Sequence, residues 1–515
     1  MKGSRKPIQL LLIAAMTMGM LAACSSNNEN DAGSSNGSSP SAGSSAEAPG
    51  ASNEATKEPY KLTMAIPVFG AVPKDLGAVQ DEINKITQAQ INTTVSILPV
   101  SIGTWTQQMN LMMSGGEKLD LAYTFGQMYS STAASGKILA LDDVLGKYGQ
   151  GIVEAVGTDY MKAAELNGKT YGVPVNGAFA TNSGVFMRKD LVEKYKIDVS
   201  SIKTMADMEP IFQTIKENEP DMVPLASGLS TPLEFDRFYD RLGDRNGVLP
   251  GYDNGLKLVN LYESKEYADQ LNLIRKWFKA GYINKDAATT QTAAEEMVKS
   301  GKAFSYFMAD KPDMLAGETR MSGRELVKAD LQPEAHSTTS DILVGLWTIA
   351  QQSENPERAM MMLNLLYTNK ELANLFAWGI EGKHYVKISD NQIDYPEGVD
   401  SKSVGYNTSL LTVPNKMITY VFKGDDPDLW EKTKEFNASA VKSKALGFSF
   451  NSEPVKNEAT AVSNVIEQYK KMLETGTVDP ADKLDEFNKK LKAAGIEKII
   501  AEKQKQLDAW AAANK

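Results

Sequence analysis

The first folded stretch of the chain alternates short apolar strands with amphipathic helices. Residues 60–69 alternate apolar and other side chains, and residues 94–100 and 119–125 form two further apolar runs of strand length. Between these runs, apolar residues recur at helical spacing after Pro73 and again across 105–112. The order β-α-β-α-β predicts a mostly parallel sheet with helices on both faces, with ligands bound beyond the carboxyl ends of the strands.

A second α/β pattern follows the first. Trp277 and Phe278 lie on a strongly amphipathic predicted helix, and an extended crossing is predicted through 331–341. The pattern also predicts four strands, at 171–175, 185–188, 301–307 and 343–350.

The last part of the chain is predicted to be helical. Asn355-Pro356-Glu357 supplies a cap and a first turn for a helix that carries Leu363 and Leu366. Further helices are predicted over 426–443, 458–474 and 480–513.

Composition excludes several classes of protein. The chain has 515 residues and is 42% hydrophobic, which predicts two or three domains. Its formal charge of -10 offers no basic stripe for a nucleic acid. One Cys and two His cannot build a zinc finger, an iron-sulfur cluster or an intramolecular disulfide.

The first residues predict export from the cell. Residues 1–23 combine a basic start, an apolar run and small residues before Cys24, as in a secretory signal peptide. The apolar run is too short for a spanning helix. The end of this segment, Leu21-Ala22-Ala23-Cys24, resembles a bacterial lipobox, which implies that Cys24 carries the lipid attachment and holds the protein at the membrane surface.

A polar tether follows Cys24. Residues 24–57 are rich in Ser, Gly and Asn and contain no large apolar side chain, so we expect a disordered tether. The pattern G-x-S-x-G at 33–37 falls inside it, where no strand or helix can form the strained turn that a serine nucleophile needs. We therefore reject it as a catalytic motif.

Several short motifs, in their order along the chain, add to the lipobox, the tether and the β-α-β start. Together they resemble the extracellular solute-binding proteins of ABC importers, family 1 (sugar-type), in the LipO-type Gram-positive lipoprotein branch. The motifs are EKLDL at 117–121, YGVP at 171–174, MRKDL at 187–191, GKAF at 301–304, NPERA at 355–359, GIEGKHY at 379–385 and LGFSF at 446–450.

The resemblance implies a periplasmic-binding-protein-like (type II) fold, with two α/β lobes joined by a hinge and a ligand cleft between them. It implies that the lobes close over the solute. Crossings between the lobes are expected near 174–178, near 332–341 and between 385 and 414. Lobe 1 is predicted to comprise 58–175 and 340–390, and lobe 2 to comprise 176–339 and 391–515.

The segment from Trp378 to Tyr385 is the first candidate for ligand binding. Two glycines end the preceding helix and leave Trp378, Glu381, His384 and Tyr385 on one irregular loop. Sugar rings stack on aromatic faces, and carboxylates and imidazoles bind hydroxyl groups. The alternative is that the aromatic rings pack on the helix while Glu381 and His384 satisfy backbone groups of the turn.

Other candidate ligand residues lie at strand ends or near the expected crossings. Each has core packing as its alternative. They are Phe69, Phe125 and Gln127 after predicted strands, Asn176 and Phe179 beside the first crossing, Trp347 after the second crossing, and Phe448, which alternates with Phe450 in a strand-like piece.

The expected function is a lipid-anchored extracellular receptor that delivers an oligosaccharide to ABC permease subunits, with a separate ATPase, and that acts as a monomer without enzymatic activity. A polysaccharide hydrolase with two carboxylates is one alternative. A receptor for peptides or other solutes, or for a sensor partner, is another. The acidic turns near Asp244 and Asp425 do not fit a calcium loop, so a structural calcium ion stays open but unsupported, and no cofactor is predicted.

Overall fold

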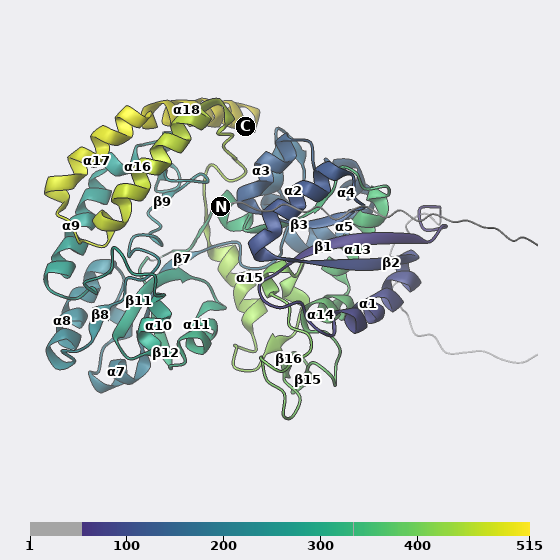
Figure 1. Ribbon diagram of the computed structural model, residues 1–515, viewed down its shortest axis with the longest axis horizontal. Coiled ribbons are helices and arrows are strands. Elements are labelled where there is room, and N and C mark those ends of the chain that lie inside the picture. Colours follow the sequence, from purple (N-terminus) through teal and green to yellow (C-terminus); the bar gives the residue numbers. More distant parts are fainter. Residues whose placement is uncertain (1–53, 333, 515) are drawn as a thin grey trace, which may run out of the picture. The chain divides into compact units, whose positions relative to one another are not determined.

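The computed structural model describes residues 54–332 and 334–514 (Figure 1). The predicted signal peptide, Cys24, the rejected serine motif and most of the predicted tether lie outside the described residues. Over the part that is described, no helix is long and apolar enough to cross a membrane.

The first sheet has five strands in the order β2-β1-β3-β14-β6. β1 is parallel to β2 and β3, whereas β14 is antiparallel to β3 and β6. The three strands predicted for the first pattern are confirmed, and the strands predicted at 171–175 and 343–350 join the same sheet as β6 and β14 instead of a second α/β pattern. The sheet is mixed instead of mostly parallel, because β14 enters it from a later passage of the chain. The strands are β1 Tyr60–Val68, β2 Thr93–Ser101, β3 Leu121–Phe125, β6 Val173–Pro174 and β14 Gly345–Ile349.

Helices that are far apart in sequence cover this sheet and share one hydrophobic core with it. The cap predicted at Asn355 is confirmed, since its side chain accepts a hydrogen bond from the Arg358 backbone N–H at 3.0 Å and Pro356 opens the helix. The helices are α1 Leu76–Ile91, α2 Trp105–Gly115, α3 Gly126–Ala134, α4 Asp142–Tyr148, α5 Gln150–Val156, α6 Thr158–Met161, α13 Pro356–Thr368 and α14 Lys370–Trp378.

The second sheet has four strands in the order β12-β7-β11-β8, and β7 is antiparallel to both of its neighbours. It has its own hydrophobic core, to which Leu271, Ile274 and Trp277 contribute one face of a helix. The elements are β7 Asn182–Arg188, β8 Val223–Leu225, β11 Ala303–Asp310, β12 Leu326–Asp330, α7 Lys189–Lys194, α8 Met208–Asn218, α9 Lys265–Lys279, α10 Ala294–Lys299 and α11 Met314–Ser322.

Short elements connect these bodies. Two-residue strands form small pairs, and a three-stranded sheet in the order β15-β16-β17 follows α14. These elements are β4 Glu165–Leu166, β5 Lys169–Thr170, β9 Tyr239–Asp240, β10 Leu249–Pro250, β13 His336–Ser337, β15 Val386–Lys387, β16 Gln392–Asp394, β17 Val421–Phe422, β18 Val441–Lys442, α12 Thr339–Ile342 and α15 Leu429–Ser439.

The chain ends in α16 Lys456–Glu474, α17 Pro480–Ala494 and α18 Ile496–Ala513 (Figure 1). α16 and α17 contact α9, and α18 contacts α16 and α17. The single helix predicted over 480–513 is wrong: Gly495 adopts a left-handed φ of 101° and separates α17 from α18. The helix predicted over 426–443 is shorter, because 441–442 form β18. The strand-like piece at Phe448 is irregular.

Three passages of chain run between the two hydrophobic cores: the first contains Thr181, the second contains His336 and the third contains 441–442. Backbone hydrogen bonds join them. Thr181 and His336 exchange two backbone bonds of 3.0 Å, which joins the first passage to the second. β13 is parallel to β18, which joins the second to a third. The third passage was expected between 385 and 414, but Tyr406 and Val413 are buried in the first core. The exact lobe boundaries stay a prediction, and this packing argues for extending lobe 1 past residue 390.

Candidate ligand-binding site

Three exposed apolar side chains and one half-buried ring lie at one edge of the first sheet. Phe69 follows β1 and Ile102 follows β2, while Phe125 ends β3 and Val344 precedes the antiparallel strand β14. Because Val68 is opposite Ser101 and Gly345 is opposite Phe125, these four residues lie at the same carboxyl edge of the parallel strands. Phe69 is 48% exposed and Val344 is 46% exposed, and exposed apolar side chains that lie together can mark a ligand-binding surface. We call these four residues the apolar edge.

Two backbone segments next to this edge, at Gly126 and at Leu343, lie very close to each other. A Cβ added at Gly126 would collide with the backbone carbonyl of Leu343, so only glycine fits there. The half-buried ring of Phe125 packs edge-on against Tyr123 at 5.0 Å and Trp105 at 6.3 Å between ring centroids. Close backbone packing and aromatic contacts therefore support this edge.

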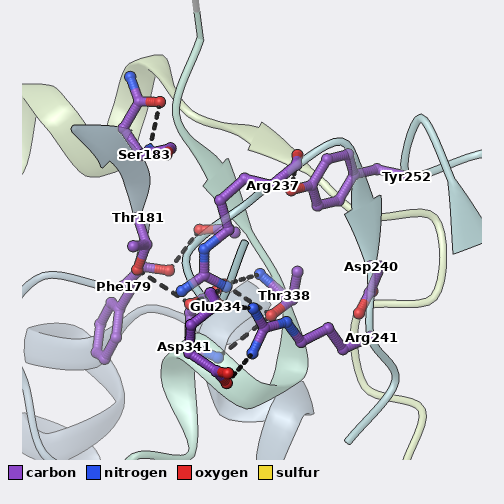
Figure 2. A network of polar contacts seen from close by, with 12 residues as sticks. Phe179, Thr181, Ser183, Glu234, Arg237, Asp240, Arg241, Tyr252, Thr338 and Asp341 are labelled. Carbon is purple, nitrogen blue, oxygen red and sulfur yellow. Dashed lines mark hydrogen bonds and ion pairs between the residues drawn. The ribbon is translucent and has the colours of Figure 1, made fainter. Parts of the chain in front are cut away.

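A buried polar network forms where Thr181, Arg237 and Asp341 meet (Figure 2). The Asp341 carboxylate accepts hydrogen bonds from the Thr181 hydroxyl at 3.0 Å, from the Thr338 hydroxyl at 2.7 Å and from the Thr338 backbone N–H at 3.2 Å. The Arg237 guanidinium points toward Thr181 and Asp341, with Nη1 3.6 Å from Asp341 Oδ1. We call Thr181, Arg237, Thr338 and Asp341 the hinge network, since they come from the first passage, from lobe 2 and from the second passage.

The hinge network and the apolar edge share one segment of the chain. Asp341 belongs to α12, and Val344 follows three residues later, immediately before β14. Charged hydrogen-bonding groups and apolar side chains therefore lie next to each other along one segment. Such a mixture suits a sugar, whose hydroxyl groups need donors and acceptors and whose C–H faces need apolar contacts.

A stacked aromatic pair flanks the network. The rings of Tyr252 and His336 are parallel within 7° with centroids 3.8 Å apart. Burial lowers the pKa of His336 despite the nearby carboxylates of Glu334 and Asp341, so the imidazole is neutral at pH 7. Asp240 lies on the same loop as Tyr252 and is buried, which raises the pKa of its carboxyl.

The predicted ligand loop at 378–385 bonds mainly to its own surroundings. The Trp378 indole donates to the Tyr420 carbonyl at 3.2 Å, and Glu381 pairs with Lys387 at 2.8 Å. His384 Nδ1 accepts from the Ile380 backbone N–H at 2.9 Å and Nε2 lies 3.1 Å from Asp75. These contacts favour the alternative of a packed turn, and Trp378, Glu381, His384 and the buried Tyr385 do not lie in the apolar edge or the hinge network.

The other candidates fall into two groups. Phe69 and Phe125 lie in the apolar edge, and Gln127 is exposed on α3, two residues after Phe125. The rest are at most 4% exposed: Asn176 donates to Ala155 and Asn415, Phe179 packs on Tyr160, Trp347 donates to the Thr412 carbonyl, and Phe448 packs on Trp510. These side chains support the fold and lie outside the apolar edge and the hinge network, so we do not include them in the proposed site.

Sequence reasoning missed several residues of this region. Ile102 and Val344 could have been found, because Ile102 follows a predicted strand and Val344 lies at the beginning of the strand predicted over 343–350. Arg237 and Asp341 carry no periodic signal. Within 54–332 and 334–514, no group of three or more His, Cys, Asp or Glu side chains is placed to hold a metal ion.

Comparison with known proteins is consistent with this arrangement. Residues 72–373 match the family described as bacterial extracellular solute-binding protein, and residues 444–512 match a domain of unknown function (DUF3502). A carbohydrate ABC transporter substrate-binding protein of Streptococcus pneumoniae is 30% identical over 467 residues, which cover 89% of this chain and 93% of that protein.

Two Bacillus subtilis proteins are more distant. The polygalacturonan/rhamnogalacturonan-binding protein YtcQ is 22% identical and covers 75% of this chain and 76% of its own length. The lipoprotein LipO is 24% identical and covers 49% of this chain and 51% of its own length.

Solved structures support the fold. The N-glycan transport solute binding protein (NgtS) of Streptococcus pneumoniae has a TM-score of 0.79 and 29% identity over 89% of this chain and 100% of that chain. The same protein in complex with Man5GlcNAc has a TM-score of 0.66 and 28% identity, with 89% and 100% of the two chains covered. The predicted two-lobed α/β fold is confirmed, and the chain belongs to the family of bacterial extracellular solute-binding proteins.

Proposed function

We propose that this protein is the receptor of an ABC importer and that it captures an oligosaccharide between its lobes. It binds the sugar at the apolar edge and the hinge network, and the lobes close because ligand contacts to both of them favour the closed state. The monomeric receptor then delivers the sugar to membrane permease subunits powered by a separate ATPase, without changing it chemically. Lipid on Cys24 holds it at the outer face of the cytoplasmic membrane.

The observation that carries this proposal is the exposed Phe69 beside Phe125 at the carboxyl edge of the first sheet. Aromatic and aliphatic side chains exposed at this position provide surfaces for sugar C–H faces. The names of the relatives support the same class of ligand: a carbohydrate transporter protein and an N-glycan transport protein that was crystallised with mannose-containing glycans.

A binding screen tests the proposal. Residues 58–515 are titrated with Man1GlcNAc and Man5GlcNAc, the glycans present in the complexes of the relative, and with neutral and acidic oligosaccharides of plant cell walls. A ligand at a hundredfold excess over its Kd stabilises the native state by about 2.7 kcal/mol, which thermal unfolding detects. Calorimetry then gives the Kd of each active sugar.

A pair of variants locates the site. Phe69→Ala removes an exposed ring from the apolar edge, and we expect it to weaken sugar binding about tenfold. Leu111→Ala removes a side chain of similar exposure, 57% against 48%, from α2, and Leu111 is not one of the four residues of the apolar edge. It should leave the Kd unchanged. Equal Kd values for both variants and the parent protein would remove the edge from the site.

The same screen distinguishes the other functions. Shortened sugars in the mixture, seen by mass spectrometry, would make the protein a hydrolase. If no sugar shifts the unfolding temperature but peptides or other polar solutes do, the protein is a receptor for that class of solute.

A further inference from the structure

A long irregular segment of lobe 2 reaches the hinge. We call residues 231–252 the arginine loop, because Arg237, Arg241 and Arg245 recur along it. Its regular structure consists of the short strands β9 and β10. A segment of this length with so few backbone ladder bonds needs contacts from outside to keep one conformation.

Buried Glu474, at the end of α16, provides the first set of these contacts. Its side chain is fully buried, and its carboxylate accepts hydrogen bonds from Arg245 Nη1 at 2.8 Å and from the Thr231 hydroxyl at 2.5 Å. The Tyr267 hydroxyl of α9 completes the set at 3.1 Å. A buried carboxylate is stable only with such partners, and two of the three belong to the arginine loop.

Other residues of α16 and α18 hold the same loop. The Lys503 ammonium group is fully buried, 2.6 Å from Asp244 Oδ1 and 3.2 Å from the Gly247 carbonyl oxygen. Lys470 pairs with Glu234 at 2.5 Å. The C-terminal helices therefore contact the loop on both sides of Arg237.

Arg237 lies between these contacts and extends into the hinge (Figure 2). Its ion pair with Asp341 at 3.6 Å is longer than a hydrogen bond. Its Nε is buried and has no hydrogen-bond partner among the described residues. A guanidinium group has five N–H donors, so Arg237 retains donors for the oxygen atoms of a ligand.

We propose that the C-terminal helices, within the matched domain of unknown function at 444–512, position the arginine loop so that Arg237 donates hydrogen bonds to sugar oxygens in the hinge. Glu474 is the central positioning residue. This inference rests on the proposed function, because it assigns a role in the same sugar site. The acceptor oxygens belong either to hydroxyl groups of a neutral sugar or to the carboxylate of a uronate.

The test is a double-mutant cycle on residues 58–515. Glu474→Gln keeps the size of the side chain but removes the charge that holds Arg245, and Arg237→Gln removes the guanidinium donors. Each variant is expected to weaken binding of the active glycan about tenfold, and Glu474→Gln should have little further effect in the Arg237→Gln background. Glu458→Gln is the matched control, since Glu458 pairs with Lys498 between the same helices, at 3.2 Å, outside the loop.

Two glycans distinguish the sources of the acceptor oxygens. Man5GlcNAc presents hydroxyl groups, and a galacturonate oligomer also presents carboxylates. If Arg237→Gln weakens only Man5GlcNAc, the acceptors are hydroxyl groups; a loss of the galacturonate oligomer alone assigns them to a carboxylate.

A ligand-free measurement separates this inference from the proposed function. Hydrogen exchange of the Glu474→Gln variant should be at least several-fold faster across 231–252, with little change in the first sheet. If neither the native protein nor any variant binds a sugar, the proposed function fails while the exchange result still decides whether the helices hold the loop. If Glu474→Gln does not fold, the variant Lys470→Gln takes its place in both measurements. Lys470→Gln removes the partly exposed ion pair with Glu234.

Two results would overturn the inference. One is exchange across 231–252 that stays as in the parent protein. The other is a loss of affinity in Glu474→Gln that persists at full size in the Arg237→Gln background, since Glu474 would then act by a route that does not include Arg237.

Discussion

At the scale of single residues, Trp347 shows why an aromatic side chain near an expected crossing is ambiguous. Its side chain is fully buried, packs on Tyr123 and Phe376, and donates its indole N–H to the Thr412 carbonyl at 3.0 Å. A tryptophan exposed at the apolar edge could instead stack on the C–H face of a sugar. Burial and hydrogen bonding decide between these roles, and the sequence reports neither.

The variant Trp347→Phe tests this interpretation. It keeps most of the ring but leaves the Thr412 carbonyl without its donor, so the free energy of unfolding should fall by about 2 kcal/mol. The Kd for the active sugar should stay the same. Denaturant unfolding and calorimetry measure the two quantities. A weaker Kd with unchanged stability would return Trp347 to the ligand site.

His336 makes stability depend on pH in a defined direction. Burial lowers the pKa of His336 in the folded protein, so the unfolded chain binds more protons as the pH falls through the ordinary histidine pKa of about 6.5. Stability is therefore lost as the pH falls below that value. The nearby Glu334 and Asp341 favour protonation and Arg237 opposes it, but burial is the largest effect.

Comparison with His336→Phe, which keeps the stacking on Tyr252, isolates this effect. The stability of the native protein should fall relative to the variant between pH 7.5 and pH 5, as measured by denaturant unfolding. The only other histidine is His384, which is present in both proteins. Parallel stability curves for the two proteins would contradict the assignment.

At the scale of elements, the periodic patterns predicted most strands and helices correctly. They did not predict a helix boundary that is set by a single glycine. The strands and helices between residues 60 and 125 and the helix that begins after Asn355 follow from side-chain period and a local cap. The break between α17 and α18 does not, because 480–513 keeps an amphipathic pattern through Gly495. Gly495 ends α17 with a left-handed φ of 101°, and an added Cβ there would lie 2.7 Å from Glu458 Cγ of α16.

Gly495→Ala tests the break. The alanine would need an unfavourable φ of 101°, and its Cβ would lie 2.7 Å from Glu458 Cγ. We expect a loss of about 1–3 kcal/mol in the free energy of unfolding. Gly146→Ala in α4 is the control, since an added Cβ meets nothing within 4 Å there. It should be neutral or stabilising by up to about 1 kcal/mol. Equal stability of the two variants would show that the turn at 495 tolerates a Cβ and does not require glycine.

At the scale of the whole molecule, the two separate cores and the three passages between them permit hinge motion. The first core includes residues from 62 to 413 and the second includes residues from 185 to 499, so each draws on distant parts of the chain. Closed and open states then differ mainly in contacts across the site, and a ligand that bridges both lobes shifts the population.

Small-angle scattering tests this closure. When residues 58–515 are saturated with the active sugar, the radius of gyration should fall, because contacts to both lobes favour the closed state. Phe69→Ala at the same sugar concentration should show a smaller change, since less of it is bound. A radius of gyration that does not change at saturation would mean that the sugar binds without closure.

The sequence by itself determined the two-lobed α/β class, the strand ends that carry Phe69 and Phe125, and the family resemblance, because each depends on side-chain period or on motifs local in the chain. The hinge network was decided only by the tertiary structure. Thr181, Arg237 and Asp341 are far apart in sequence, and long-range packing brings them together. The sequence likewise could not show that Trp347 is core, since the burial of one aromatic ring depends on every element that packs around it.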